Sequence, residues 1–222
     1  MRDYVTLKNC RNAAALSAVV SAMAVPRILL GGVSPGILIP AAFLTMMFVA
    51  GAATAWSRKA GMEGLLRDPR RTLTACGAAA LAAFALIPLQ HIVLEPIFRE
   101  ALAASGDDRW MDLQFPGTMH GWLALVLWSA GFQTLFLDVG PVCLFARLTN
   151  RRSAAVALTV AVHVLVVLRQ MAVYGVESSL LLLLGSAAVE SAMSCVLFVK
   201  GGLLPTMIFS AGLQVHHLWP AS

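Results

Sequence analysis

Three ionisable side chains lie deep inside apolar stretches of this chain, where they could act as an acid, a base or a ligand. They are Asp138, His163 and Glu190. Charge inside a membrane span is unfavourable, so each such group is a candidate functional residue. A carboxylate can serve as a general base, and an imidazole can move a proton or bind a metal ion. We take these three as the candidate catalytic set; a purely structural polar cluster is the competing interpretation.

Other polar residues occupy the same stretches or their ends. The third apolar stretch has Gln90 and His91, and Glu95 at its outer end. A further group lies near stretch ends, where side chains can reach water; its members are Arg169, Lys200, His216 and His217. We expect this second group to be solvated rather than functional.

The elements that position these residues must be membrane-spanning helices. Apolar residues make up 59% of the 222 residues and charged residues only 12%, about half the charged share of a soluble domain. A soluble protein could not cover its surface with so few charges. In lipid the backbone groups must be paired within each span, and continuous apolar runs favour helices over barrel strands. The predicted fold class is therefore an all-α polytopic membrane protein.

Seven apolar stretches are long enough to cross a hydrocarbon core of about 30 Å. They are residues 12–32, 36–56, 72–94, 121–145, 153–168, 178–199 and 203–218. Their short connections predict about seven helices in one bundle and a single membrane domain over 1–222. Pro141 follows Gly140 inside the fourth stretch, and the missing proline N–H predicts a kink there.

The distribution of charge predicts how the chain is oriented. The formal net charge is +5. Basic residues gather in three connecting segments: Arg2, Lys8 and Arg11; Arg58, Lys59, Arg67, Arg70 and Arg71; Arg147, Arg151 and Arg152. The long loop 95–120 holds Glu100, Asp107, Asp108 and Asp112. The positive-inside rule then predicts a cytoplasmic N-terminus and an external C-terminus in a bacterial inner membrane. The basic residues thus fit the positive-inside pattern of a protein in a lipid bilayer. They therefore give no reason to expect a nucleic-acid partner.

The first stretch, the cysteines and the short catalytic motifs each allow a test of a competing interpretation. Arg11, an apolar run and Ala22-Met23-Ala24 are similar to a cleavable signal peptide, but the apolar character resumes at Ile28, which favours a retained span. The four cysteines are widely spaced without a C-x-x-C pair, so no metal or redox centre is expected from them. No H-E-x-x-H motif occurs either. We predict no cofactor and no tightly bound zinc.

From residue 122 to 218 the chain resembles the CAAX-protease and bacteriocin-processing family of intramembrane endopeptidases. GFQTLFLDVGPVCLFARL lies where that family has a Glu-Glu-x-x-x-Arg helix, and ALTVAVHVLVVL lies where it has Phe-x-x-x-His. VLFVKGGLLPTMIFSAGLQV is similar to the segment that leads into its last catalytic helix. The resemblance implies a helical bundle in which glutamates and histidines activate water against a peptide bond.

Most of the catalytic residues that the resemblance implies are replaced in this sequence. Gln133 and Thr134 stand at the paired glutamates, and Asp138 stands at the arginine. Ser210 and Gln214 stand at the late histidine and asparagine. His163 is the one motif residue retained, and Thr159 replaces the phenylalanine. Glutamine cannot accept a proton as glutamate does, and one histidine is a poor metal site.

Three functional hypotheses remain open. The first is a noncatalytic relative that holds a transmembrane or lipidated partner in an intramembrane cavity. The second is an active peptidase in which Asp138 or Glu190 is the base and His163 orients water or binds metal. The third is a small proton-coupled transporter, or an unrelated membrane subunit, with a proton path through the three residues.

Overall fold

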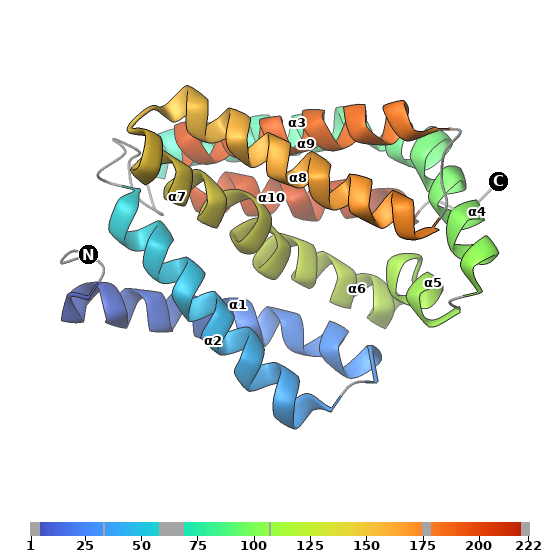
Figure 1. Ribbon diagram of the computed structural model, residues 1–222, viewed down its shortest axis with the longest axis horizontal. Coiled ribbons are helices and arrows are strands. Elements are labelled where there is room, and N and C mark those ends of the chain that lie inside the picture. The colour runs from blue at the N-terminus through green and yellow to red at the C-terminus, as the bar shows by residue number, and fades with distance from the viewer. Residues whose placement is uncertain (1–4, 33, 58–68, 107, 175–178, 219–222) are drawn as a thin grey trace.

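The computed structural model describes residues 5–32, 34–57, 69–106, 108–174 and 179–218, which contain helices and no strand (Figure 1). The α-helices are α1 (Leu7–Leu30), α2 (Pro35–Trp56), α3 (Pro69–Pro88), α4 (Glu95–Ser105), α5 (Asp108–Gln114), α6 (Met119–Trp128), α7 (Gly140–Thr149), α8 (Arg152–Tyr174), α9 (Leu180–Gly201) and α10 (Leu203–Leu213). Two segments are π-helical, η1 (Leu89–Leu94) and η2 (Ser129–Val139), and η3 (Gln214–Leu218) is a 3₁₀ helix.

Six helical segments in the described residues are long and apolar enough to cross a membrane. They are Leu7–Leu30, Pro35–Trp56, Arg70–Ala104, Met119–Thr149, Arg152–Val173 and Leu180–Gly201. The seventh predicted span, 203–218, differs: it is an eleven-residue α-helix followed by five residues of 3₁₀ helix. The chain is therefore a polytopic helical membrane protein, with six full-length spans and one shorter terminal segment.

The surface has the character expected of a protein whose solvent is lipid. Large apolar side chains point outward along the spans, as Ile37, Leu81 and Leu181 do at 71%, 72% and 86% exposure. The interior is rich in small residues, which let helices approach closely without a hydrophobic driving force. Gly212 shows this best, because a Cβ there would lie 2.8 Å from the Cβ of Ala83. Glycine at this position therefore lets α10 pack closely against α3.

Each π-helical segment ends two residues before a proline. η1 ends at Leu94 before Pro96, and η2 ends at Val139 before Pro141. A proline ring clashes with the carbonyl four residues earlier, and a wider turn relieves that clash. The kink predicted at Gly140-Pro141 therefore takes the form of a π-helical segment, whose last amide, that of Gly140, bonds to the carbonyl of Leu135 five residues back.

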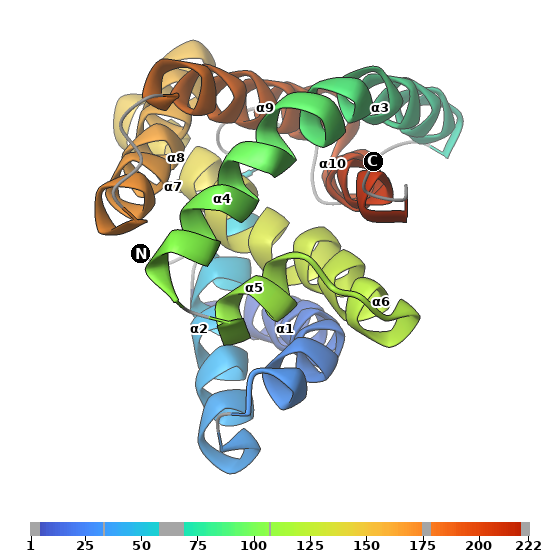
Figure 2. The same ribbon diagram turned by 90° about the vertical axis from the view of Figure 1, so that its right-hand side faces the viewer.

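The loop predicted over 95–120 is helical for most of its length. Glu95 begins α4, which Figure 2 shows lying across one end of the bundle toward α5. The helix buries Ala101 and Leu102 and ends at Gly106, whose φ of 69° suits glycine. The acidic residues of this segment predicted a loop, but its apolar face packs against the bundle and makes it helical. Glu95 lies at the start of this helix and is 6% exposed.

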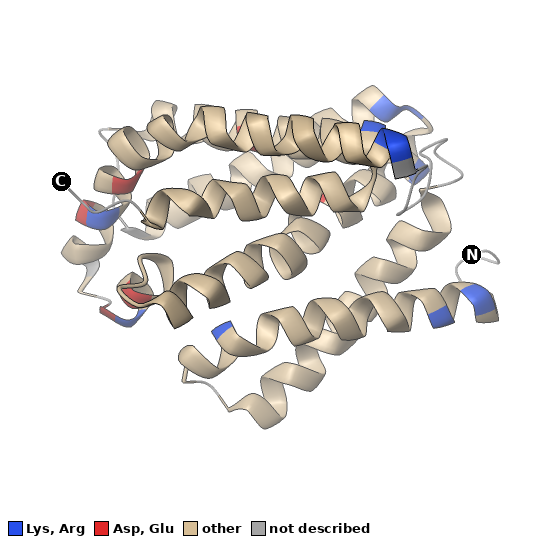
Figure 3. Ribbon diagram, turned by 180° about the vertical axis from the view of Figure 1, so that it is seen from behind, with Lys and Arg blue, Asp and Glu red and all other residues tan. Residues whose placement is uncertain are grey.

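Charge separates between the two ends of the bundle. Figure 3 shows most lysines and arginines near the end that holds the N-terminus, and most acidic residues at the opposite end. Of the residues used to predict orientation, Arg2, Arg58, Lys59, Arg67 and Asp107 lie outside the described part of the chain. Most of the described lysines and arginines still share one end, whereas Arg27 and Arg99 bond to Leu113 and Glu95 near the acidic end.

Candidate functional site

A cavity of about 690 Å³ lies between the helices and is bordered by residues of α1, α2, η1, α4, α5, α6, η2, α8, α9, α10 and η3. Its wall is mostly apolar, with side chains such as Leu125, Phe132 and Val166. Its polar and charged lining side chains are Arg27, Gln90, Glu95, Gln114, Ser129, Gln133, Asp138, His163, Gln170, Glu190, Ser191, Ser194, Ser210, Gln214, His216 and His217. Apolar walls with a few convergent polar groups are typical of a ligand site.

Asp138 lies on η2 and is 5% exposed. Its Oδ2 accepts a hydrogen bond of 2.6 Å from the Ser194 hydroxyl, and its Oδ1 accepts a longer one of 3.4 Å from Ser191. The Nδ1 atom of His163 lies 3.8 Å from Oδ1, beyond hydrogen-bond range. Asp138 and His163 thus face each other as the sequence argument expected, but hydroxyls on α9 are the donors that stabilise the carboxylate.

Glu190 points into the same cavity from α9. Its Oε1 accepts a hydrogen bond from the side-chain amide of Gln90 on η1. This contact joins residues that are 100 positions apart and ties the third span to the sixth. The three residues predicted as a catalytic set therefore share one cavity, and their roles in catalysis remain a prediction.

The substituted motif positions also meet in this region. Gln133, Ser210 and Gln214 border the cavity, and Thr134 is fully buried behind them. Thr134 donates to the carbonyl of Ser129, and its oxygen lies 2.8 Å from the hydroxyl of Ser210. The Ser129 hydroxyl donates to Gln133 over 3.1 Å. These side chains therefore satisfy one another, and none of them carries an ionisable group.

The π-helical turns decide which side chains reach the cavity. Gln133 and Asp138 are five residues apart on η2, and Gln90 and Glu95 are five apart across η1 and the start of α4. In an α-helix such pairs would lie about 140° apart around the axis. In a π-helix, whose hydrogen bonds join residues five apart, they lie about one turn apart. Both pairs consequently face the cavity.

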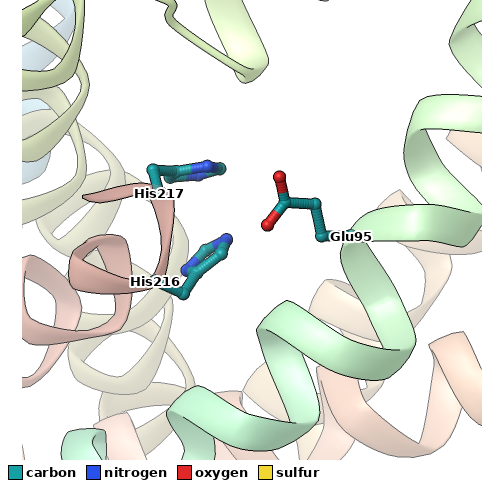
Figure 4. A group of neighbouring side chains, drawn as sticks. All are labelled: Glu95, His216 and His217. Atoms are coloured by element: carbon teal, nitrogen blue, oxygen red, sulfur yellow. The ribbon is translucent and has the colours of Figure 1, made fainter. Parts of the chain in front are cut away.

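A second group of ligating side chains lies at the α4 end of the cavity. Figure 4 shows Glu95, His216 and His217 pointing toward one another from α4 and η3. One nitrogen or oxygen atom from each lies within 4.8 Å of the others. Glu95 also pairs with Arg99, whose Nη2 lies 2.7 Å from Oε1, and its Oε2 lies 3.0 Å from Nδ1 of His91.

The two histidines of this group are buried or half-buried, and burial disfavours the charged imidazolium. A neutral imidazole keeps a lone pair on one nitrogen, which it can offer to a metal ion or a hydrogen-bond donor.

From the sequence, His216 and His217 were predicted to lie at the end of a span with their side chains in water. The structure corrects this, because His216 is 6% exposed and both rings point into the bundle. The predicted topology already allowed these histidines to meet Glu95, because it puts Glu95 and the end of the seventh stretch on the same side of the membrane. By contrast Arg169 and Lys200 are exposed, as predicted.

The cavity thus carries two separate sets of reactive groups. One is Asp138, held by two serines, with His163 beside it; the other is Glu95 with His216 and His217 at the α4 end. The first set can hold or relay a proton, and the second offers the donor atoms that transition metals prefer. No protein-family model, no curated protein and no solved structure significantly matches this chain.

Proposed function

We propose that this membrane protein binds the membrane-embedded part of a partner in its central cavity and does not cleave it. The embedded part would be the lipid-modified end of a protein or a transmembrane segment. In this proposal residues 122–218 adopt a CAAX-protease-like arrangement whose peptidase chemistry has been lost, and the N-terminus lies in the cytoplasm of a bacterial cell.

The observation that carries the proposal is the hydrogen bonding among the side chains that replace the family's catalytic residues. Thr134, Ser210 and Gln133 use their polar groups to bond to one another and to Ser129. Water activation needs a group that accepts a proton, and an amide or hydroxyl at these positions is a poor one. The pocket remains, but the positions of the paired glutamates and of the late histidine lack acid and base groups.

The cavity has the size and chemistry for such a ligand. A volume of about 690 Å³ lies within the range of sites that enclose small molecules, about 300–1,000 Å³. It could take a prenyl chain or several apolar side chains of a helix. The polar residues along its wall would meet the peptide groups or the thioether end of that ligand.

Binding can be measured with the full chain in detergent. We expect saturable binding of a fluorescent farnesylated peptide or of a transmembrane peptide, and none of the same soluble peptide without its lipid. Val166→Trp would fill the cavity from α8 and weaken binding by about tenfold, equivalent to 1.4 kcal/mol. Leu165→Trp is the matched control, because Leu165 is 61% exposed on the same helix.

Equal affinity in the two tryptophan variants would contradict the proposal, since the ligand would then bind outside the cavity. Absence of saturable binding for both peptide classes would contradict it as well. If only one peptide class binds, the result identifies that class as the partner.

One observation favours an active peptidase as the second candidate. His163 Nδ1 is buried, lacks a hydrogen-bond partner within the described residues and lies beside Asp138 on the cavity wall. A histidine whose ring nitrogen is unsatisfied can orient a water molecule next to a carboxylate base. A cleavage assay, described in the Discussion, separates this candidate from the noncatalytic one.

A further inference from the structure

We propose that Glu95, His216 and His217 bind a divalent first-row transition-metal ion, and that zinc suits the site best. Two imidazoles and one carboxylate are a common ligand set for zinc sites with three protein ligands. The three side chains come from α4 and η3, more than a hundred positions apart in sequence, and border the cavity described above.

The distances allow one ion to contact all three groups after a small adjustment. The ligand atoms lie within 4.8 Å of one another. A tetrahedral zinc ion with bonds of about 2.0–2.1 Å separates its ligands by about 3.4 Å. Closing this gap requires shifts of about 1 Å, which rotations of the long Glu95 side chain and of the two rings can supply.

The tautomer of His216 leaves its outer nitrogen free for a metal. Its Nδ1 lies 2.5 Å from the carbonyl of Leu213 and must donate, since a carbonyl only accepts. The neutral ring then carries its lone pair on Nε2. A backbone carbonyl on the second nitrogen is the usual support of a metal-bound histidine, because it fixes the ring and raises its basicity.

His217 supplies the independent sign that a ligand is missing. Its Nδ1 is buried and has no hydrogen-bond partner within the part of the chain that the structure describes. An unsatisfied polar atom in a buried position is unfavourable by about 1–3 kcal/mol. An ion bound by Nδ1, or a water on that ion within hydrogen-bond reach of Nδ1, would remove this penalty.

The surroundings hold the histidines in place. The indole N–H of Trp122 donates to the carbonyl of Gln214 over 2.8 Å, which anchors the start of η3 to α6. The ring of Phe115 packs edge-on against His217 with centroids 5.6 Å apart. Both contacts restrict η3, so the imidazoles are preorganised for a ligand.

The pairing of Glu95 with Arg99 weakens the site without blocking it. Arg99 contacts Oε1 through two nitrogens, at 2.7 and 2.8 Å, and its side chain is 42% exposed. His91 contacts Oε2. Each carboxylate oxygen accepts two partners, so Oε2 retains a lone pair for the ion. His91 is close enough to donate a hydrogen bond to this oxygen and so orient the carboxylate.

This proposal departs from the prediction of no tightly bound zinc, which was made from the sequence motifs. Glu95, His216 and His217 form no sequence motif and meet only in the tertiary structure. Metal binding at Glu95, His216 and His217 requires neither partner binding nor catalysis, so it can be tested by itself.

The experiment uses the full chain in detergent, purified through a tag without histidine and stripped with a chelator. We expect one Co²⁺ per chain to bind with the visible absorption of a low-symmetry site, and Zn²⁺ to displace it. Zinc counted by mass spectrometry after buffer exchange should also approach one per chain. Each of Glu95→Gln, His216→Asn and His217→Asn should weaken binding by about a hundredfold or more.

The control is His120→Ala, which removes an exposed histidine outside the group and should bind as the unsubstituted chain does. Circular dichroism and size exclusion establish that each variant is folded. The unsubstituted chain decides the question without any variant: if it binds neither Co²⁺ nor Zn²⁺ saturably, the proposal is wrong. It is equally wrong if zinc persists in His216→Asn and His217→Asn but is lost in His163→Ala.

Discussion

The hydroxyl of Ser194 donates a hydrogen bond of 2.6 Å to Oδ2 of Asp138 and so holds a buried carboxylate from a different span. The two residues lie 56 positions apart, on α9 and η2. Ser191 adds a longer bond to the other oxygen. The charge at the centre of the cavity is therefore stabilised chiefly by neutral donors of one helix.

We expect Ser194→Ala to destabilise the protein by about 1.5–3 kcal/mol, the usual worth of a hydrogen bond to a buried charged group. The measurement is the thermal unfolding midpoint in detergent. Ser186→Ala is the matched control, because Ser186 is also buried on α9 but donates to its own helix at Leu183. Equal shifts in the two variants would show that the bond to Asp138 adds nothing.

His163→Ala should destabilise the protein less than Ser194→Ala does. With His163 as the sole donor to Asp138, its loss would leave a bare buried charge and destabilise by about 3–5 kcal/mol. The structure instead gives Asp138 two serine donors, and His163 lies 3.8 Å away. The same unfolding assay ranks the two variants, and the reverse order would show an ion pair stronger than the geometry indicates.

The close approach of α10 to α3 predicts an effect of adding one methyl group. Gly212→Ala would place a Cβ 2.8 Å from that of Ala83, and such overpacking is unfavourable by about 1–3 kcal/mol. Gly185→Ala is the control, since a Cβ there meets nothing within 4 Å. We expect a lower unfolding midpoint for Gly212→Ala and an unchanged or slightly higher one for Gly185→Ala, because alanine favours helix.

The orientation of the spans can be tested with truncated reporter fusions. A reporter fused after Arg71 or Arg152 should report the cytoplasm, and one fused within 104–112 should report the exterior. A fusion at the C-terminus should also report the exterior, because η3 ends beside Glu95 at the acidic end of the bundle. If the first two sites and the 104–112 site fall on one side of the membrane, the topology is wrong.

We predict no cleavage of prenylated or transmembrane peptides above background by the purified chain. The positions of the paired glutamates and of the late histidine lack acid and base groups, and each lost member of a catalytic unit commonly lowers the rate by orders of magnitude. Peptide products are detected by mass spectrometry. Cleavage that disappears in His163→Ala, in a variant that still unfolds cooperatively, would replace the noncatalytic proposal with the peptidase.

Composition and charge determined the class of this protein without any coordinates. With 59% apolar and 12% charged residues, only a bilayer can be the solvent for most of its surface. The unfavourable energy of charge in lipid likewise requires Asp138, His163 and Glu190 to point inward. These inferences depend on residue type and stretch length, both of which are local properties of a sequence.

Only the tertiary structure decided which polar groups meet. The length and apolar content of the stretches predicted the spans but not the π-helical turns before the prolines at 96 and 141. These turns bring Gln90 toward Glu190 and place Gln133 with Asp138. The meeting of Glu95 with His216 and His217 needed a buried α4 and a short η3. Side-chain direction depends on such local departures from the ideal helix and on packing between distant segments, neither of which follows from hydrophobic periodicity.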